Sequence, residues 1–414
     1  MLTELEITEL RGKFPALSKQ VENRTAVYFD GPAGTQVPQS VIDAISHYLS
    51  HHNANHGGVF HTSIESDQVV DEAHRAAAAF VGAPDPDTIA FGANMTTLTL
   101  ALSRALALTW QAGDEVVVSR LEHDANFSPW VLAARDVGAT VRYIDFDPSD
   151  CTLLLDQYAD AINEKTRLVA VGCASNAVGT INPVKQICGW AREAGALSFL
   201  DAVHYAPHAL IDVEDWGCDF LACSAYKFFG PHVGILYGRR ELLESTQPYK
   251  LRPSPDDLPG RWMTGTQNFA CLSGTLAAID YLADIGRKDS DGELDRRAAL
   301  VRSFDRVTEY EHAILKPLLE GLAENPKVKV WGITDPARSN ERCPTLSLTH
   351  ADHKPKELAA YLASKGVFVW HGNYYALPLT ERLGVEPEGM VRIGLVHYNT
   401  REEVDHLVAA LSQS

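Results

Sequence analysis

The chain has 414 residues, of which 45% are hydrophobic and 22% are charged. This composition is typical of a globular enzyme with a large core and two or three structural units. The net charge of −18 argues against nucleic acids and anionic membrane surfaces as partners.

The N-terminal residues, the apolar stretches and the cysteines indicate the cellular compartment. The start, residues 1–7, is acidic and unlike a secretory signal, and no apolar stretch approaches the length expected of a membrane span. The seven cysteines contain no Cys-x-x-Cys pair, and their odd number argues against a disulfide framework. We therefore expect a cytoplasmic protein with reduced thiols that binds neither nucleic acid nor membrane.

The first two thirds of the chain are predicted to contain short strands that alternate with helices. Residues 1–25 predict a helix and a connector, 31–35 form a turn of small residues, and 38–50 predict a helix. Short apolar strands are then expected at 88–91, 115–119, 140–144, 168–172, 197–200 and 220–224, with helices such as 98–108, 128–136 and 184–194 between them. This alternation predicts an α/β fold with a mainly parallel sheet covered by helices on both faces.

The last third predicts a smaller α+β unit. A highly charged stretch at 287–302 leads to a helix at 303–322, strands near 328–331, 343–348, 367–370 and 390–395, and a final helix at 401–411. We predict three regions: an N-terminal segment (1–25) that can pack on the small domain, a large domain (26–285) and a small C-terminal domain (286–414).

Lys227 is the most informative residue. An apolar strand delivers it to a Gly-Pro turn, and a lone buried lysine is costly unless it is neutral or covalently used. Asp201 ends another apolar strand. A lysine that forms an imine and a carboxylate that keeps a pyridine nitrogen protonated fit pyridoxal 5′-phosphate (PLP). A buried Lys–Asp ion pair would give the same local pattern.

A phosphate site is predicted where residues 92–97 open a helix. Backbone amides at a helix start, with hydroxyls beside them, bind phosphate, although any well-capped helix has this sequence pattern. Met95 and Thr96 belong to this segment. Ser224, three residues before Lys227, can add a hydroxyl to the same phosphate.

Three further side chains follow strand ends, where ligands bind in doubly wound sheets. His123 can stack on a pyridine ring or relay protons, or it can simply bond to the backbone of its loop. Asn176 and His204 are candidates for bonding the phenolic oxygen of the cofactor.

Arg392 lies within an apolar strand, where it can bind a substrate carboxylate or form an interdomain ion pair. The histidines at 47, 51, 52, 56 and 61 have no acidic or cysteine ligand at a suitable spacing, so we predict no metal site. His56 and His61 could instead lie at the mouth of the active site.

Together these motifs resemble the class V aminotransferase superfamily of fold-type I PLP enzymes, and most of all its group II cysteine desulfurase and selenocysteine lyase branch. The resemblance runs from about residue 28 to residue 411. It rests on the order and spacing of these segments: Glu122-His123-x-Ala125-Asn126, Ser175-Asn176, Asp201, Ser224-x-x-Lys227-x-x-Gly230-Pro231, Gly265-Thr266-x-Asn268 and Arg392.

The resemblance implies a role for each matching residue. Lys227 would carry the cofactor and move protons, Asp201 would contact the pyridine nitrogen, and His123 would stack on the ring. Thr266 would reach the phosphate from the neighbouring subunit of a homodimer, and Arg392 would hold the carboxylate of a small amino-acid substrate. Substrate contacts are also expected from Asn176, Gly31, Ala33, His61 and Tyr375.

Three features depart from the family pattern. Tyr375 stands where the desulfurases carry a mobile-loop cysteine, Tyr226 and His204 replace a histidine and a glutamine, and the loop 57–61 lacks an arginine. A phenol cannot hold sulfur as a persulfide. The chain is therefore similar to a desulfurase-like subfamily without the usual catalytic cysteine.

From this we expect a PLP-dependent lyase of amino-acid metabolism that acts on the β-carbon of a small amino acid without persulfide chemistry. Elimination, desulfination, decarboxylation or carbon–carbon bond formation would each fit. An aminotransferase or an amino-acid epimerase is the alternative, because the same residues support proton transfer. A minor alternative is a PLP-binding interaction protein without catalytic activity.

Overall fold

The structure is a computed structural model that describes residues 1–21, 23–290 and 292–414. Its largest sheet has seven strands in the order β4-β12-β11-β10-β9-β5-β6. Strand β12 is antiparallel to both neighbours, and the other pairs are parallel. The strands are β4 (Ile89–Gly92), β5 (Glu115–Ser119), β6 (Thr140–Ile144), β9 (Thr166–Gly172), β10 (Leu197–Asp201), β11 (Phe220–Ser224) and β12 (Gly234–Gly238). The predicted α/β fold is confirmed.

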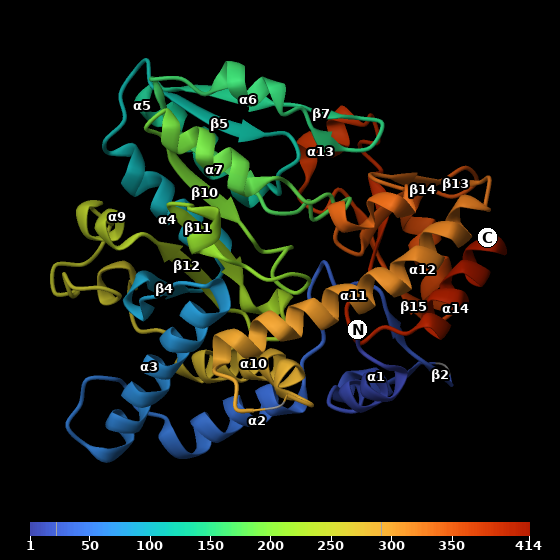
Figure 1. Ribbon diagram of the computed structural model, residues 1–414, viewed down its shortest axis with the longest axis horizontal. Helices are drawn as coiled ribbons and strands as arrows, with labels where there is room; N and C mark the ends of the chain where they lie inside the picture. The colour runs from blue at the N-terminus through green and yellow to red at the C-terminus, as the bar shows by residue number, and fades with distance from the viewer. Residues whose placement is uncertain (22, 291) are drawn as a thin grey trace.

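Helices cover both faces of this sheet because its strands are apolar on both sides. On β5, Val116 and Val118 pack in one cluster with helices α4 (Met95–Ala107) and α5 (Ser128–Val137), while Val117 belongs to the other cluster. That second cluster includes residues of α3 (His61–Val81), α6 (Asp156–Ala161) and α7 (Val184–Glu193). Figure 1 shows the sheet between these groups of helices.

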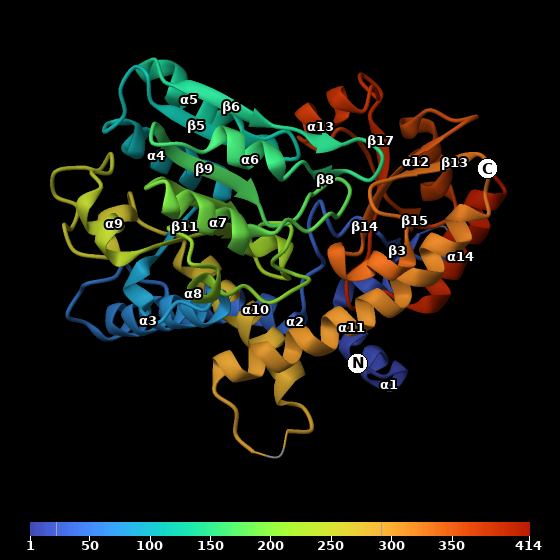
Figure 2. The ribbon, with the colours of Figure 1, turned by 45° about the horizontal axis from the view of Figure 1, so that its top comes forward.

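A four-stranded antiparallel sheet forms the second unit, in the order β13-β14-β17-β16. Its elements are β13 (Val328–Trp331), β14 (Thr345–His350), β16 (Trp370–Gly372) and β17 (Met390–Gly394), with helices α12 (Pro355–Ser364), α13 (Leu377–Arg382) and α14 (Arg401–Ser412). The long helix α11 (Arg296–Ala323) packs on α10 (Phe269–Arg287) and reaches α14 (Figures 1 and 2). The exact domain limits at 25/26 and 285/286 stay a prediction.

Several elements differ from the prediction. Helix α11 begins at Arg296, inside the charged stretch 287–302, of which residue 291 lies outside the described residues. The helix expected at 38–50 is α2 (Gln39–His47), followed by a turn of π-helix (Tyr48–His52). The strand expected at 367–370 is divided, since β15 (Val367–Phe368) pairs with β3 (Val27–Tyr28) and β16 joins the four-stranded sheet.

The N-terminal segment 1–25, of which residue 22 is outside the described part, contains α1 (Glu4–Arg11), β1 (Gln20–Val21) and β2 (Arg24–Thr25). The remaining short elements are β7 (Phe146–Asp147), β8 (Thr152–Leu153), α8 (Val213–Trp216) and α9 (Arg240–Ser245).

Helix α10 is the one described helix long and apolar enough to cross a membrane by length and composition. It departs from the expectation that no stretch approaches this length. However, most of its residues are buried, and it packs against α2, α3 and α11. These contacts account for its apolar composition, because a helix that is apolar all round belongs in a protein core as well as in a membrane.

The packing of α10 on α11 leads to a stability prediction for Gly286→Ala. A Cβ atom at Gly286 would lie 1.9 Å from the carbonyl oxygen of Ala299, so the two helix backbones must separate. We expect the free energy of unfolding to fall by about 1–3 kcal/mol, as for other overpacked sites. Urea unfolding followed by circular dichroism measures this change.

Gly189→Ala in helix α7 is the matched control, since a Cβ atom there meets nothing within 4 Å. It should raise the free energy of unfolding by about 0.5–1 kcal/mol through helix propensity alone. Equal effects of the two substitutions would show that the contact between α10 and α11 is not tight.

Candidate active site

A pocket with about 570 Å³ of empty space, part of it open to solvent, lies at the carboxyl ends of the parallel strands. It is bounded by the ends of β5, β9, β10 and β11 and by the start of α4. The structure brings most of the predicted site residues together here. The predicted residues that line it are Met95, Thr96, His123, Asn176, Asp201, His204, Ser224 and Lys227.

Lys227 follows β11 in a short 3-10 turn and projects into the pocket, where its Nζ donates a hydrogen bond to the carbonyl of Pro32. Burial lowers the pKa of this amine from 10.5 to about 7, the Arg392 guanidinium adds to the shift, and Asp201 opposes it. A large fraction of the amine is therefore neutral near neutral pH, and a neutral amine is the nucleophilic form.

Asp201 ends β10 and is 7% exposed. Its Oδ1 accepts a hydrogen bond of 2.8 Å from the Val203 amide. Burial raises the pKa of this carboxyl to about 6, while the Val203 amide and Lys227 oppose the shift. The group is mostly ionised at neutral pH and can pair with a cationic ring nitrogen.

The His123 ring stands beside the pocket in a defined protonation state. Burial lowers its pKa to about 4, with further lowering by Lys227 and Arg392, so the ring is neutral at neutral pH. Its Nδ1 accepts a hydrogen bond of 3.0 Å from the Ala125 amide, which assigns the proton to Nε2. The ring also stacks on Tyr375, with centroids 5.6 Å apart.

The start of α4 provides the features of an anion site. Asn94 caps the helix by accepting a bond from the Thr97 amide, and the Met95 amide donates to Ser224 Oγ at 2.9 Å. Gly234 lets the adjoining strand approach, because a Cβ atom there would lie 2.4 Å from the Asn94 carbonyl carbon. Helix-start amides beside the hydroxyls of Thr96 and Ser224 suit a phosphate.

Buried polar atoms without partners lie at the other end of the pocket. Asn176 Oδ1 and His204 Nε2 are both buried, and neither has a hydrogen-bond partner among the described residues. Burial keeps the pKa of His204 well below its usual value, so its ring is neutral. Such orphaned groups are rare in folded proteins and indicate a ligand position. They fit a polar oxygen of a bound cofactor.

Arg392, in the middle of β17, is 4% exposed and lies near this end. Its Nη1 donates to the Asn176 carbonyl at 2.9 Å, and its Cζ lies 4.3 Å from the centre of the Tyr374 ring. Its Nε is buried without a partner. Burial lowers the pKa to about 10, so the guanidinium stays charged and is available to a carboxylate.

Gly31 and Ala33 lie in the turn whose Pro32 carbonyl contacts Lys227, and a bridge from Asp30 to Gly394 holds this turn next to β17. Asp30 was not predicted. Its Oδ1 is buried without a partner, and burial raises the pKa of this carboxyl to about 6. The roles of Gly31 and Ala33 in substrate binding stay predictions.

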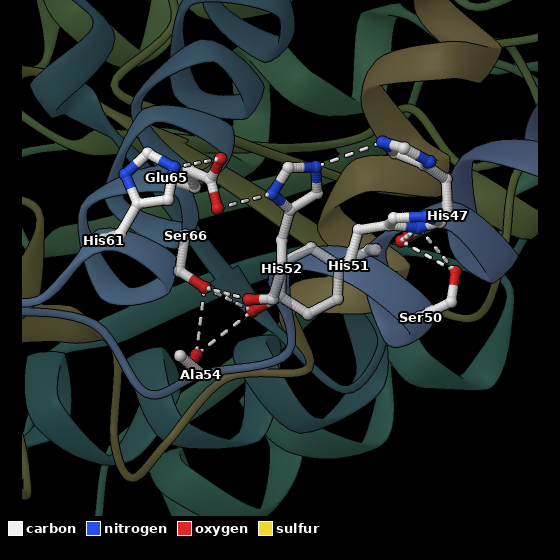
Figure 3. A network of polar contacts seen from close by, with 9 residues as sticks. His47, Ser50, His51, His52, Ala54, His61, Glu65 and Ser66 are labelled. Carbon is white, nitrogen blue, oxygen red and sulfur yellow. Dashed lines mark hydrogen bonds and ion pairs between the residues drawn. The ribbon is translucent and has the colours of Figure 1, made fainter.

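Arg392, Tyr375, Gly31 and Ala33 adjoin residues of this pocket without lining it, and Thr266 and His61 lie elsewhere. Thr266 lines a separate groove with Thr97 and His232. His61 has a side chain that is 87% exposed and pairs with Glu65 at 3.2 Å. Figure 3 shows that His61 belongs to a surface network in which His52 contacts both Glu65 and His47. Groups of three or more ligands able to hold a metal are absent from the described residues.

Sequence reasoning named Glu122 within the family motif but gave it no role, and it lines the pocket beside His123. Its carboxyl accepts hydrogen bonds from Ser119 Oγ at 2.5 Å and Asn126 Nδ2 at 2.7 Å, and burial raises its pKa to about 7. Asn126 in turn accepts a bond from Trp130 Nε1 at 3.0 Å. This network holds the loop that carries His123, and its sequence signals were the spacing Ser-x-x-Glu-x-x-x-Asn and the motif Glu122-His123-x-Ala125-Asn126.

The loop with Tyr375 lies against the pocket. Asn176 Nδ2 donates to the Tyr374 carbonyl at 2.9 Å, and the Asp124 amide donates to the Tyr375 carbonyl at 2.7 Å. Tyr374 and Tyr375 have φ angles of 56° and 60°, an unusual left-handed conformation for bulky residues. The cysteines, all seven of which lie in the described part of the chain, are free thiols and none lines the pocket.

This fold, with a lysine and an aspartate at neighbouring strand ends and an anion site opposite, defines a PLP-dependent enzyme of fold-type I. The family model described as aminotransferase class-V matches residues 27–407. The chain belongs to the class-V aminotransferase family.

Relatives and solved structures agree with this assignment. A cysteine desulfurase of Pectobacterium carotovorum is 31% identical over 98% of this chain and 97% of its own length. A probable cysteine desulfurase of Mycolicibacterium paratuberculosis is 32% identical, and the chain spans 58% of that protein. The apo structure of a cysteine desulfurase from Thermococcus onnurineus superposes with a TM-score of 0.87 at 26% identity, covering 98% of this chain and 97% of the other.

A cysteine desulfurase structure from Escherichia coli has a TM-score of 0.83 at 26% identity and covers 98% of both chains. These relatives overturn one hypothesis. The expectation of a reaction without persulfide chemistry is wrong, because full-length relatives are desulfurases, which use that chemistry. The prediction failed because a phenol at residue 375 shows only that this side chain cannot carry the persulfide. Another thiol can accept the sulfur.

The lowered pKa of Lys227 predicts how the cofactor-free protein takes up PLP. The rate constant of uptake should rise with pH through about 7 and then level off, because the neutral amine is the reactive form. An ordinary lysine would give a rate that rises until about pH 10. Rapid mixing with PLP, followed by absorbance, measures the profile, and a midpoint above pH 9 would contradict the inferred environment of Lys227.

Proposed function

We propose that this protein is a cysteine desulfurase, which converts L-cysteine to L-alanine and passes on the sulfur. The observation that carries the proposal is the convergence of Lys227, Asp201, His123 and Arg392 around one pocket, in a chain similar over its full length to desulfurases. Bound PLP supplies an electron-accepting ring that stabilises negative charge next to the amino acid's α-carbon.

The protein's own residues divide the remaining work. The Arg392 guanidinium binds the substrate carboxylate, and its unpartnered Nε provides a further donor. Asp201 would hold the ring nitrogen of PLP, and the start of α4 with Ser224 would hold its phosphate. The neutral amine of Lys227 takes the proton from the α-carbon and returns a proton to the product.

Product analysis with L-cysteine tests this proposal. The PLP-loaded protein, given L-cysteine and excess dithiothreitol, should form alanine and sulfide in equal amounts. Pyruvate with ammonia would indicate β-elimination instead, and a keto acid with one equivalent of the aminated cofactor would indicate transamination. Either outcome without alanine would overturn the proposal.

We also propose a cytoplasmic homodimer. Thr266 and His61 lie outside their own chain's pocket, so their expected contacts require a second subunit. Val59 and Phe60, next to His61, are 97% and 58% exposed. Apolar residues that are covered at a subunit interface look exposed in this way when one chain is considered alone. Seven free cysteines are consistent with a reducing compartment. Sedimentation analysis of the purified protein tests the dimer, and a monomer at micromolar concentration would contradict it.

A further inference from the structure

We propose that a small-molecule thiol, entering beside Tyr375, is the second substrate and receives the sulfur as its persulfide. This inference rests on the proposed desulfurase function and identifies the acceptor. It is carried by the positions of the chain's own thiols and by the loop that covers His123.

The chain's thiols are placed where they do not face their own chain's pocket. Six of the seven are buried, and five of these belong to the main apolar core: Cys151, Cys173, Cys188, Cys218 and Cys223. Cys343 is also buried. Burial raises the pKa of each of these thiols, so they stay protonated, and the thiolate is the nucleophilic form.

Cys271 is the internal rival, since it is only partly buried. It lies in the first turn of α10, where its amide donates to Asn268 Oδ1 at 3.1 Å. Asn268 borders the groove that contains Thr266, and Cys271 does not line the pocket of Lys227. Burial raises the pKa of this thiol too, so it is not an activated nucleophile in this chain.

The loop of Tyr375 marks the entry for the acceptor. Its backbone is held to the pocket wall by the bonds from Asn176 and Asp124, while its ring covers one face of His123 and is 71% exposed. Two successive bulky residues in the left-handed region are energetically unfavourable. This conformation places residue 375 between solvent and His123.

The fixed backbone favours a small acceptor. An acceptor has to pass the exposed phenol ring, which can rotate about its side-chain bonds without breaking the two backbone bonds. A cysteine on a protein loop would bring its flanking backbone as well, next to a Tyr375 backbone that the bonds from Asn176 and Asp124 hold in place. We therefore assign the acceptor as a low-molecular-weight thiol.

The transfer is balanced without an oxidant. The thiolate of the acceptor RSH attacks Sγ of the bound cysteine and forms the S–S bond, while the Cβ–Sγ bond breaks and leaves its electron pair on Cβ. Cβ takes up a proton, equivalent to the one that RSH lost. The sum is RSH plus cysteine giving RSSH plus alanine, in which sulfur is oxidised and Cβ is reduced.

A single-turnover experiment tests the proposal. The PLP-loaded protein is mixed with labelled L-cysteine below the concentration of active sites, so that free cysteine cannot act as an acceptor. Without added thiol we expect almost no alanine. With dithiothreitol or glutathione, alanine should form at a rate proportional to thiol concentration, and alkylation with mass spectrometry should find the sulfur on the added thiol.

Three variants sharpen this test. In Tyr375→Cys, alanine should form without added thiol, and one extra sulfur atom should be found on the peptide that contains residue 375. Tyr375→Ser should stay dependent on added thiol, which separates the new thiol from the loss of the phenol. Cys271→Ser should behave as the unaltered protein.

The outcomes separate the two proposals. Alanine formed by the unaltered protein without added thiol, with sulfur on its Cys271 peptide or any other, would overturn the external acceptor and leave the desulfurase function intact. Activity with a cysteine-containing peptide but with neither small thiol would overturn the assignment to a small molecule. No alanine under any condition, in any variant, would overturn the desulfurase function itself and the acceptor with it.

Discussion

Lys227→Ala is expected to reduce kcat for alanine formation by about a thousandfold or more, because the variant loses the group that moves the α-proton. The amine is the pocket's only described lysine, and its lowered pKa suits proton transfer near neutral pH. Borohydride reduction and peptide mapping should attach PLP to Lys227 in the unaltered protein and to no peptide in the variant.

Lys185→Ala is the matched control for that experiment. Lys185 is a solvent-exposed lysine on α7 that pairs with Asp215 at 2.5 Å and does not line the pocket of Lys227. It should retain full activity and cofactor labelling. Activity in Lys227→Ala within tenfold of the unaltered protein would contradict the role of Lys227.

Asp201→Asn is expected to reduce kcat by about 10- to 100-fold with little effect on folding. The amide keeps the shape and the acceptor for the Val203 amide, but it removes the negative charge that pairs with the ring nitrogen. A charge-assisted hydrogen bond contributes about 1.5–3 kcal/mol, which corresponds to this range. Steady-state kinetics at saturating L-cysteine measure the change.

Asp215→Asn serves as the control, because Asp215 is an exposed carboxylate on α8 that pairs only with Lys185 among the described residues. Its kcat should be unchanged. The absorbance spectrum of bound PLP should shift in Asp201→Asn and not in Asp215→Asn. An unshifted spectrum with full activity would place the ring nitrogen elsewhere.

Much of the large sheet and of the pocket could be predicted from local sequence. Strands β5, β6 and β11 have the predicted bounds, because each is a short apolar run bordered by turn residues. Lys227, Asp201, His123 and Asn176 share one pocket, since parallel strands end at the same edge of a sheet. Their placement required no knowledge of side-chain contacts.

The features that were missed depend on contacts between distant segments. The division of 367–370 between two sheets follows from the pairing of β15 with β3, which lies more than three hundred residues earlier in the chain. The left-handed backbone at Tyr374 and Tyr375 depends on bonds from Asn176 and Asp124, and local propensity disfavours it. Glu122 was named in a motif without a role, because its burial arises only when Ser119 and Asn126 surround it.

The bridge between Asp30 and Gly394 has a consequence for how the protein is made. The carbonyl that receives the Lys227 hydrogen bond lies near the start of the chain, and the strand beside it lies near the end. A ribosome must therefore release almost the entire polypeptide before this bridge and the Arg392 end of the site can form, and such long-range closure is slow. Nascent fragments that lack β17 should therefore lack the group that binds the substrate carboxylate, so catalysis would begin only after translation ends.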